Sequence, residues 1–425
     1  MKILHVIGQR PEKTGSGFYL RAIAAEAKKN GLTNFMVAGV PATDPADLEC
    51  IPSDCCQYTL FESDYLNFPV TGMSDVMPYR SSLFRDLKND RLEAYKNAFS
   101  RTLKKAVDIY KPDIIHAHHL FVVTALARKL FPGLPMVATC HGTDLRQYTN
   151  CEHLREFVRK YCRRLDRIIA LTNDQKKEII KLFDISPDKI YTIGGGYDET
   201  IFSRESKPLE DEVQLLYAGK FNRSKGVPWL LRSLNRIKDQ DWHLHMAGSG
   251  NGPEFDECVL LAGKLGQKVT IHGYLNHHQL SALMKKTHIQ ILPSFFEGLP
   301  LVLFEGLACG CRIITTNLPG FEEIFGPAKR ETIELINLPL LQTIDKPYLK
   351  DEEHLERVLS EKISRMIAIV RENPEYSDKH AEKIARDHTW QQVFLRILAV
   401  YKEAIQNKTH KNEAAYKHFK RSYES

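Results

Sequence analysis

The stretch IQILPSFFEGLPLVLFEGLACG, residues 289–310, changes its pattern twice. IQILP is an apolar run of strand length, SFFEGLP is a loop with glycine and proline, and LVLFEGLACG is a helix that ends at Gly310. A buried strand that leads through a short loop into a helix is the repeating unit of a parallel α/β sheet. Two carboxylates, Glu297 in the loop and Glu305 in the helix, lie in this otherwise apolar unit, and buried carboxylates need partners.

The same alternation of short apolar strands and longer amphipathic helices runs through the chain in two series. The polar stretch SRESKPLEDE, residues 203–212, separates the two series and indicates a linker. A chain of 425 residues also exceeds the usual size of one hydrophobic core. We therefore predict an α/β protein with two doubly wound, Rossmann-like domains, over residues 1–203 and 204–384, followed by a C-terminal helix within about 385–425.

The expected elements can be placed by residue range. Strands are predicted at 2–8, 34–40, 112–119, 135–142, 167–172 and 189–196, and then at 213–220, 242–250, 268–274, 289–294 and 311–317. Helices are predicted at 17–31, 91–110, 122–131, 227–234, 301–310 and 388–407. Residues 41–90 are less regular and receive no assignment. Ligands of such sheets bind at the carboxyl ends of the strands, so we expect the functional site in the cleft between the two domains.

Composition is that of an ordinary globular protein, with 43% apolar and 26% charged residues. The net charge of +6 is too small for this length to indicate nucleic acid binding, but it suits an anionic ligand. No apolar run approaches the roughly 20 residues of a membrane span, and MKILHVIG indicates a first strand and not a signal peptide. The nine cysteines include no CxxC pair, so we expect free thiols in a reducing cytoplasm.

Several turns after predicted strands carry charged or glycine residues. AGKFNRSKG, residues 218–226, places Lys220, Arg223 and Lys225 in one turn, which suits a diphosphate, although a solvated basic loop would look the same. Gly15, Ser16 and Gly17 follow the first strand and open a helix, so that they either approach a phosphate or only form a turn. MAGSGNGPEF, residues 246–255, indicates a turn.

Histidines follow two strands of the first series. His141 and Asp144 lie in ATCHGTDL, where the histidine either contacts a ligand or transfers a proton, or has a structural role. HAHH, residues 116–119, suggests a metal site, but no carboxylate or cysteine cluster accompanies it. We therefore expect no metal.

Glu297 and Glu305 flank the start of the predicted helix. The amides near Leu299 to Leu301 are free at a helix N-terminus and can bind a phosphate. Carboxylates accept hydrogen bonds from sugar and ribose hydroxyls, so the stretch could meet a sugar, a diphosphate and a ribose in sequence. The alternative is that Glu297 caps the helix and Glu305 pairs with a lysine.

This stretch resembles the signature of the retaining glycosyltransferases of family 4, which have the GT-B fold. The resemblance covers most of the chain in the family's order, through GSG near residue 16, HGTD at 141–144, GGGYDETIF at 194–202, GKFNRSKG at 219–226, AGSGNG at 247–252 and NLPGFEEI at 317–324. It implies that the C-terminal helix packs back on the first domain.

The resemblance also implies roles for particular residues. Glu297 would bind hydroxyls of the donor sugar, Glu305 the ribose, and Lys220 and Lys225 the diphosphate, with help from Arg223. His141 would contact the donor sugar, and backbone near Tyr274 would meet the base. We expect catalytic roles for His141, Lys225 and Glu297. The full set expected to bind the donor comprises Gly15, Ser16, Gly17, Lys220, Arg223, Lys225, Tyr274, Glu297, Gly298, Leu299, Pro300, Leu301 and Glu305.

The acceptor is less defined. GSG, HGTD and LTND, residues 171–174, are similar to stretches of the N-acetylglucosaminyl-malate synthases, which places Asp144 and Thr172 on the acceptor side and suggests UDP-N-acetylglucosamine as donor. The basic stretch EFVRKYCRRLDR, residues 156–167, suggests instead contact with an anionic membrane that carries a lipid acceptor, although a basic solvated face explains it as well.

The chemistry implied is transfer of a sugar from a nucleotide sugar, in particular a UDP-sugar, with retention of configuration and without a metal. Two other classes of protein share the expected architecture. An exported two-domain binding protein would not need Glu297, Lys225 and His141 together. A dinucleotide-dependent oxidoreductase needs GxGxxG followed by an acidic residue, and this spacing is missing.

Overall fold

The computed structural model describes residues 1–46, 48–75, 77–209, 211–343, 345–376 and 378–423, with side chains as far as residue 408. The chain divides into two compact units. The first comprises Met1–Gly194 together with Val393–Ser425, and the second comprises Gly195–Gln392. The chain therefore passes from one unit to the other twice.

The first unit is built on a seven-stranded sheet in the order β3-β2-β1-β6-β7-β8-β9, and every pair in it is parallel. Its strands are β1 (Lys2–Ile7), β2 (Thr33–Pro41), β3 (Cys56–Phe61), β6 (Ile114–His118), β7 (Met136–Thr139), β8 (Arg167–Ala170) and β9 (Ile190–Thr192). A separate parallel pair joins β4 (Thr71–Gly72) to β5 (Ser82–Leu83).

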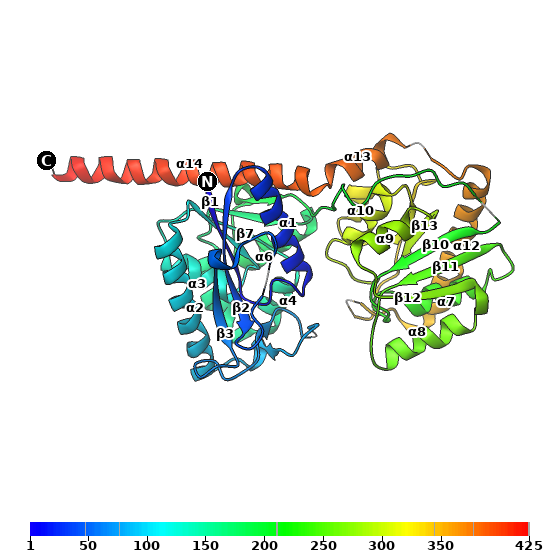
Figure 1. The fold of residues 1–425 in the computed structure, drawn as a ribbon, viewed down its shortest axis with the longest axis horizontal. Coiled ribbons are helices and arrows are strands. Elements are labelled where there is room, and N and C mark those ends of the chain that lie inside the picture. Colours follow the sequence, from blue (N-terminus) through cyan, green and yellow to red (C-terminus); the bar gives the residue numbers. More distant parts are fainter. Residues whose placement is uncertain (47, 76, 210, 344, 377, 424–425) are drawn as a thin grey trace. The chain divides into compact units, whose positions relative to one another are not determined.

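Helices alternate with these strands. They are α1 (Gly15–Lys29), α2 (Asn89–Tyr110), α3 (Val122–Leu130), α4 (Thr143–Asn150), α5 (Glu152–Cys162), α6 (Asn173–Phe183) and, from Val393 onward, α14 (Trp390–Tyr423). In Figure 1, α2 and α3 lie on one side of β1, β2 and β3, and α1 lies on the other. The sheet is therefore covered on both faces, which is why β6 and all of β1 after Lys2 are buried, including the histidines that they carry.

The second unit repeats this architecture with a six-stranded parallel sheet in the order β12-β11-β10-β13-β14-β15. Its strands are β10 (Val213–Ala218), β11 (Trp242–Ala247), β12 (Val269–Gly273), β13 (Ile289–Leu292), β14 (Arg312–Thr316) and β15 (Ile333–Ile336). Its helices are α7 (Val227–Asn235), α8 (Pro253–Gly263), α9 (His277–Met284), α10 (Leu301–Ala308), α11 (Phe321–Phe325), α12 (Glu352–Glu372) and α13 (Lys379–Asp387). Two doubly wound α/β units are thus present, as predicted.

Short 3-10 turns complete the described structure at Ser53–Cys55, Phe84–Asp86, Pro187–Lys189, Gly266–Lys268 and Leu349–Asp351. The nine cysteines are free, as expected. Among the described residues, no helix is both long and apolar enough to cross a membrane.

The boundary between the units differs from the predicted one at 203/204. Tyr197 and Phe202 lie in the hydrophobic core of the second unit. Lys207, in the middle of the predicted linker, is buried, and its Nζ donates to the carbonyl oxygens of Met284 and Thr287 at 2.9 and 2.6 Å. The same ammonium also lies 3.3 Å from the Cys311 Sγ, so it has three acceptors, two carbonyl oxygens and one sulfur atom. The polar stretch is therefore anchored to the second unit and is not a solvated linker.

The C-terminal helix packs on the first unit, as the resemblance implied. Tyr401 of α14 shares a hydrogen bond of 2.6 Å with His116 Nδ1 on β6, and Glu403 pairs with Arg167 on β8 at 2.7 Å. Arg396 donates to the carbonyl oxygen of Ile193 at 3.1 Å. The chain returns to the first unit at Gln392/Val393, later than the expected start of this segment at about 385, because α13 and the beginning of α14 belong to the second unit.

Four strands were not predicted from the sequence, namely the two-residue strands β4 and β5 and the longer strands β3 and β15. β3 lies in the stretch 41–90 that received no assignment, and it is a half-exposed edge strand with polar residues. β15 carries Glu334 at its centre, which hides the apolar pattern. This glutamate is buried because Lys362 of α12 lies 2.6 Å from it.

Gly248 is expected to be intolerant of a side chain. Its φ is +138°, and a Cβ there would lie 1.8 Å from the carbonyl oxygen of Gly219, because the turns after β10 and β11 pack closely. We expect Gly248→Ala to lower the free energy of unfolding by roughly 1–3 kcal/mol. Urea unfolding would measure the change. Gly263→Ala in α8 is the control, since its Cβ meets nothing within 4 Å and alanine favours a helix, so it should be neutral or stabilising. Equal loss in both variants would contradict this packing argument.

Candidate functional site: the turns after β10 and β13

The strand order of the second unit places two predicted functional turns side by side. β10 lies between β11 and β13 in the sheet. From β10 the chain continues to β11 on one side, and from β13 it continues to β14 on the other, so the strand order reverses between β10 and β13. At such a topological switch point the carboxyl ends of the two strands face a crevice in which α/β proteins bind ligands. The turn 219–226 follows β10, and the turn 293–300 follows β13. A hydrogen bond of 2.9 Å from the Phe295 amide to the Ser224 carbonyl oxygen joins them.

Lys225 and Glu297 form an ion pair at this edge. Lys225 Nζ lies 2.7 Å from Glu297 Oε1, and the two side chains are 24% and 13% exposed. Ser294 donates to the same carboxylate oxygen at 2.7 Å, and the Lys225 amide donates to Asn222 Oδ1 at 2.9 Å. A cation and a carboxylate are therefore held in fixed positions at the carboxyl ends of β10 and β13.

The start of α10 offers free amides beside this pair. Pro300 is the N-cap, and within the described chain no side chain caps this helix. Its first backbone hydrogen bond runs from the Leu303 amide to the Pro300 carbonyl oxygen at 3.1 Å, so the amides of Leu301 and Val302 have no acceptor inside the helix. The alternative in which Glu297 caps α10 is wrong, because its carboxylate binds Lys225 and Ser294 instead.

Glu305 lies one turn further into α10. Its side chain is only 6% exposed, and burial raises its pKa to about 7. Among the described residues no lysine or arginine offsets this shift, so the alternative of a lysine partner has no support. A carboxyl group that is partly protonated near neutral pH can both donate to and accept from the hydroxyls of a sugar.

Lys220 and Tyr274 follow β10 and β12 at the same carboxyl-terminal edge of the sheet, and both side chains are exposed. The Lys220 carbonyl oxygen accepts from the Tyr217 hydroxyl at 2.6 Å, and no carboxylate in the described parts of the chain lies within ion-pair distance of its ammonium. Tyr274 follows β12 and is 80% exposed, after Gly273 with a φ of +70°. Both are accessible to a ligand.

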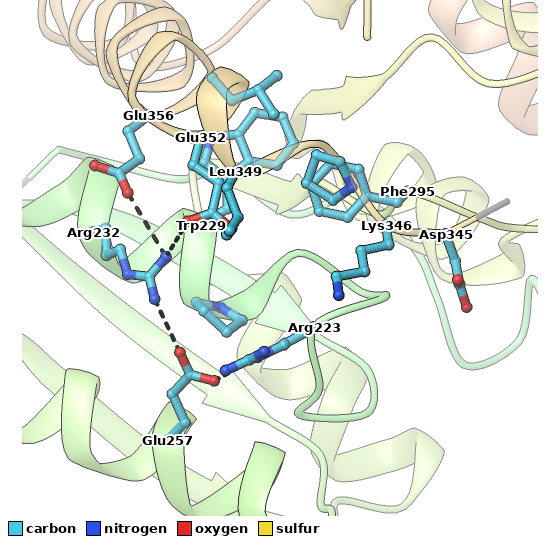
Figure 2. Close-up of a pocket in the computed structure, with 13 residues that line it drawn as sticks. Arg223, Trp229, Arg232, Glu257, Phe295, Asp345, Lys346, Leu349, Glu352 and Glu356 are labelled. Carbon is cyan, nitrogen blue, oxygen red and sulfur yellow. Dashed lines mark hydrogen bonds and ion pairs between the residues drawn. The ribbon is translucent and has the colours of Figure 1, made fainter. Parts of the chain in front are cut away.

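Arg223, in the same turn, is engaged by carboxylates of a neighbouring helix. Its Nε lies 2.7 Å from Glu257 Oε2 on α8, and its amide donates to Glu254 at 3.1 Å. Arg232 of α7 lies 2.9 Å from the other oxygen of Glu257. Figure 2 shows Glu257 reaching both arginines. Arg223 is thus paired with Glu257 in this structure, and its help in binding a diphosphate stays a prediction.

Arg223 and Glu257 instead line a pocket of about 240 Å³ beneath α7 and α12. Its apolar wall contains Trp229 and Phe295, whose rings stack at 5.3 Å between centroids. Pockets for small molecules usually measure about 300–1,000 Å³, so this one is small for a nucleotide sugar. Its lining also excludes Lys225, Glu297 and Glu305.

Gly15, Ser16 and Gly17 form the first turn of α1 and not a loop. Thr14 is the N-cap, and its Oγ1 accepts from the Gly17 amide at 3.2 Å. A Cβ at Gly17 would lie 2.0 Å from the Pro11 carbonyl oxygen, whereas one at Gly15 would meet nothing within 4 Å. Gly17 is thus explained by packing, and Gly15 leaves its backbone open to a ligand.

His141 follows β7 in the first unit and is partly exposed. Its Nε2 lies 3.2 Å from His118 Nδ1, and the two rings stack with centroids 5.5 Å apart. The edge of Tyr19 packs against it at 5.2 Å between centroids. Burial lowers the pKa of His141 well below its usual range, so the ring is neutral at pH 7 and can donate or accept one hydrogen bond.

Asp144 and Thr172 are both engaged by backbone groups. The Asp144 carboxylate is fully buried and accepts from the amides of Leu120 and His141 at 2.7 and 3.2 Å. Thr172 is the N-cap of α6, and its Oγ1 accepts from the Gln175 amide at 3.1 Å. Both residues therefore shape the backbone at the carboxyl ends of β7 and β8, and direct contact with an acceptor stays a prediction.

Three residues outside the predicted set hold predicted site residues in place. Ser294 binds Glu297, His118 binds His141, and Gln9 donates to Thr14 and Ser16 at 3.2 and 3.0 Å. Ser294 lies two residues after the end of β13, where polar residues are expected to face a ligand, so its position in the sequence offered a signal. Gln9 offered none, because its role depends on how the chain folds back.

Two family models match this chain. The model of Glycosyltransferase Family 4 matches residues 76–201, and the model of Glycosyl transferases group 1 matches residues 198–336, within the second unit. The chain thus carries a glycosyltransferase family 4 segment followed by a group 1 segment. The second match contains Lys220, Lys225, Glu297 and Glu305, so this candidate site lies within the group 1 match.

Individual relatives of this chain are distant in sequence. It is 27% identical over 224 residues to a glycogen synthase of Mycobacterium tuberculosis, an alignment that covers 50% of this chain and 54% of the relative. The chain thus spans about half the length of that curated relative. Sucrose-phosphate synthase from Thermosynechococcus elongatus has a similar structure, with a TM-score of 0.68 and 17% identity over 96% of this chain and all of the other. The structure of Anabaena HepE in complex with UDP-glucose is also similar, with a TM-score of 0.61 and 15% identity over 95% of this chain and 100% of the other. These similarities confirm the predicted GT-B fold.

The predicted similarity to N-acetylglucosaminyl-malate synthases stays a prediction, as does membrane contact through α5. That helix buries Leu154, Val158 and Cys162 and exposes arginines on its outer face. Two of these, Arg159 and Arg163, pair with Asp184 at 3.5 and 3.3 Å.

Proposed function

We propose that this protein transfers a sugar from a nucleotide sugar to an acceptor hydroxyl with retention of configuration. The observation that carries the proposal is the Lys225–Glu297 pair, 2.7 Å apart, beside the free amides of α10. A diphosphate needs cations and amides, and a sugar needs carboxylates, and this edge of the second unit provides both. The structural similarity to Anabaena HepE, which was solved in complex with UDP-glucose, supports UDP as the nucleotide.

Each residue has a part in this mechanism. As the bond between the anomeric carbon and the diphosphate breaks, the sugar gains oxocarbenium character and the diphosphate gains charge. Lys225, Lys220 and the amides at the start of α10 stabilise the leaving group, so that no metal is needed for this task. Glu297 binds hydroxyls of the sugar, and Glu305 binds the ribose. The acceptor hydroxyl attacks from the face that the diphosphate leaves, and a departing phosphate oxygen takes its proton.

The first unit is proposed to serve the acceptor. The roles that the family resemblance gives to His141, Gly15, Asp144 and Thr172 stay predictions. We propose either a small anionic molecule or a lipid carrier as the acceptor. UDP-N-acetylglucosamine is the proposed donor to test first.

Thermal unfolding in the presence of nucleotide sugars tests this function. Without added metal, UDP, UDP-glucose and UDP-N-acetylglucosamine would each be tested, with GDP-mannose as the control for the base. We expect a UDP compound at roughly 100-fold above its Kd to raise Tm by about 5–10 °C, since it binds the folded state. Mass spectrometry of the products would then separate an enzyme from a protein that only binds. Absence of a shift with every nucleotide sugar would contradict the proposal.

A further inference from the structure

Three histidines face one another on the sheet of the first unit. His5 lies on β1, and His116 and His118 lie two residues apart on β6, so the latter two share one face of their strand. β1 and β6 pair in parallel with His5 directly opposite His116. All three side chains are buried, with at most 2% exposure, and one ring nitrogen of each lies within 4.8 Å of the other two.

His5 presents a bare lone pair to this cluster. The Asn34 amide nitrogen donates to the Ala24 carbonyl oxygen at 2.8 Å, which fixes the orientation of the Asn34 side chain. Asn34 Oδ1, 3.0 Å from His5 Nε2, can only accept, so His5 Nε2 carries the proton. In the neutral ring Nδ1 is then unprotonated, and it is buried without a hydrogen-bond partner among the described residues.

His118 has a second nitrogen of the same kind. Its Nδ1 lies 3.2 Å from His141 Nε2, while its Nε2 is buried and has no partner in the described parts of the chain. Buried polar atoms are nearly always satisfied, and an exception calls for a specific cause such as a water molecule or an ion. Two such nitrogens in one cluster favour a single shared partner.

We propose that His5, His116 and His118 bind one divalent transition-metal ion, with zinc as the best match. Imidazole nitrogen is a preferred ligand of zinc, and three histidines form a known zinc ligand set. Two nitrogens bound at Zn–N distances of about 2.0–2.1 Å in a tetrahedral site lie about 3.3 Å apart, so the rings close by small rotations. Asn34 and His141 hold the opposite nitrogens of His5 and His118, and such contacts orient metal ligands.

Tyr401 of α14 lies at the remaining side of the cluster. Its hydroxyl oxygen is 2.6 Å from His116 Nδ1, and His116 Nε2 is 2.8 Å from Thr139 Oγ1. An ion bound through His116 Nδ1 replaces the hydrogen bond to Tyr401 and brings the phenol oxygen into reach as a fourth donor. The ion then ties β1, β6 and α14 together, so its role is structural, and the chemistry proposed for the second unit does not depend on it.

Metal content of the full chain tests this site. The protein would be expressed with zinc in the medium, and also refolded from denaturant with zinc because the site is buried. It would then be desalted and measured by plasma mass spectrometry. We expect about one zinc ion per chain and at least a tenfold lower content in His118→Gln and His5→Gln. Refolding with cobalt(II) should give the visible absorption of a tetrahedral cobalt site.

His245→Gln is the matched control. His243 and His245 on β11 and His272 on β12 repeat the same arrangement in the second unit, but both nitrogens of His245 have partners, His272 at 3.0 Å and Gln214 at 2.9 Å. Its zinc content should equal that of the unmodified chain. Equal losses in His245→Gln and His118→Gln would overturn the assignment.

A second measurement covers variants that fail to fold. The unmodified chain refolded with zinc should unfold at a higher temperature than the same chain refolded with a chelator. Less than about 0.1 zinc ion per chain after both expression and refolding, with no tetrahedral cobalt spectrum, would overturn the proposal and leave an ordered water as the partner of these nitrogens.

Discussion

Lys225→Ala is expected to lower turnover with a UDP-sugar donor by about 100- to 1,000-fold, which is the usual cost of removing one group that stabilises developing charge. The Lys225 ammonium lies 2.7 Å from Glu297 and at the end of β10, where the diphosphate is proposed to leave. Its loss removes a cation from the leaving group and also leaves the Glu297 carboxylate, only 13% exposed, without its ion-pair partner. Steady-state release of UDP would measure the change in kcat.

Two further variants make this result specific. Arg223→Ala removes a cation from the same turn, but that guanidinium binds Glu257, so we expect a loss within about fivefold. Lys238→Ala removes an exposed charge after α7 and should change nothing. Thermal unfolding of each variant would check that it folds. Near-normal turnover in Lys225→Ala would refute the role given to this lysine.

The free energy of unfolding is expected to fall by about 3 kcal/mol between pH 4.5 and pH 8 because of Glu305. Burial raises the pKa of this carboxyl to about 7, while in the unfolded chain it returns to about 4.5. The folded state therefore keeps the proton at pH values where the unfolded chain has lost it. Stability from this group is complete below about pH 4.5 and is lost as the pH rises through 7.

Glu305→Gln removes the titration and should flatten this part of the stability profile. The difference in unfolding free energy between Glu305→Gln and the unmodified chain, measured by urea unfolding at pH 5, 6, 7 and 8, should shift in favour of glutamine as the pH rises. Glu372→Gln, at an exposed position at the end of α12, should leave the profile unchanged. A difference that stays constant with pH would show that Glu305 is not buried as described.

Much of the fold was accessible from the sequence because both sheets are parallel and buried. Most of their strands are short and rich in apolar residues, and glycine-rich turns follow many of them, so 11 strands could be placed from local pattern alone. β15 was not predicted because Glu334 interrupts its apolar pattern, and the cations that pair with this glutamate, Lys362 and Arg365, come from a distant helix. The predicted linker failed for a similar reason, since the acceptors of the Lys207 ammonium lie about 80 residues away.

The same distinction between local pattern and distant contacts applies to the residues of the candidate site. Glu297, Glu305 and Lys225 follow predicted strands, so the rule that ligands bind at the carboxyl ends of strands was enough to select them. The partner of Arg223 could not be predicted, because Glu257 comes from a helix 34 residues further along the chain. The contact between His118 and His141 depends in the same way on the pairing of β6 with β7.

The division of the chain also has a consequence for folding during synthesis. Residues 393–408 complete the first unit, and the bond between His116 and Tyr401 joins positions 285 residues apart. When residue 194 leaves the ribosome, the sheet of the first unit is fully made, but the helix that covers His116 is still about 200 residues away. At common synthesis rates this is roughly 10–40 s, during which the second unit can fold first. The N-terminal unit is thus the last to be completed.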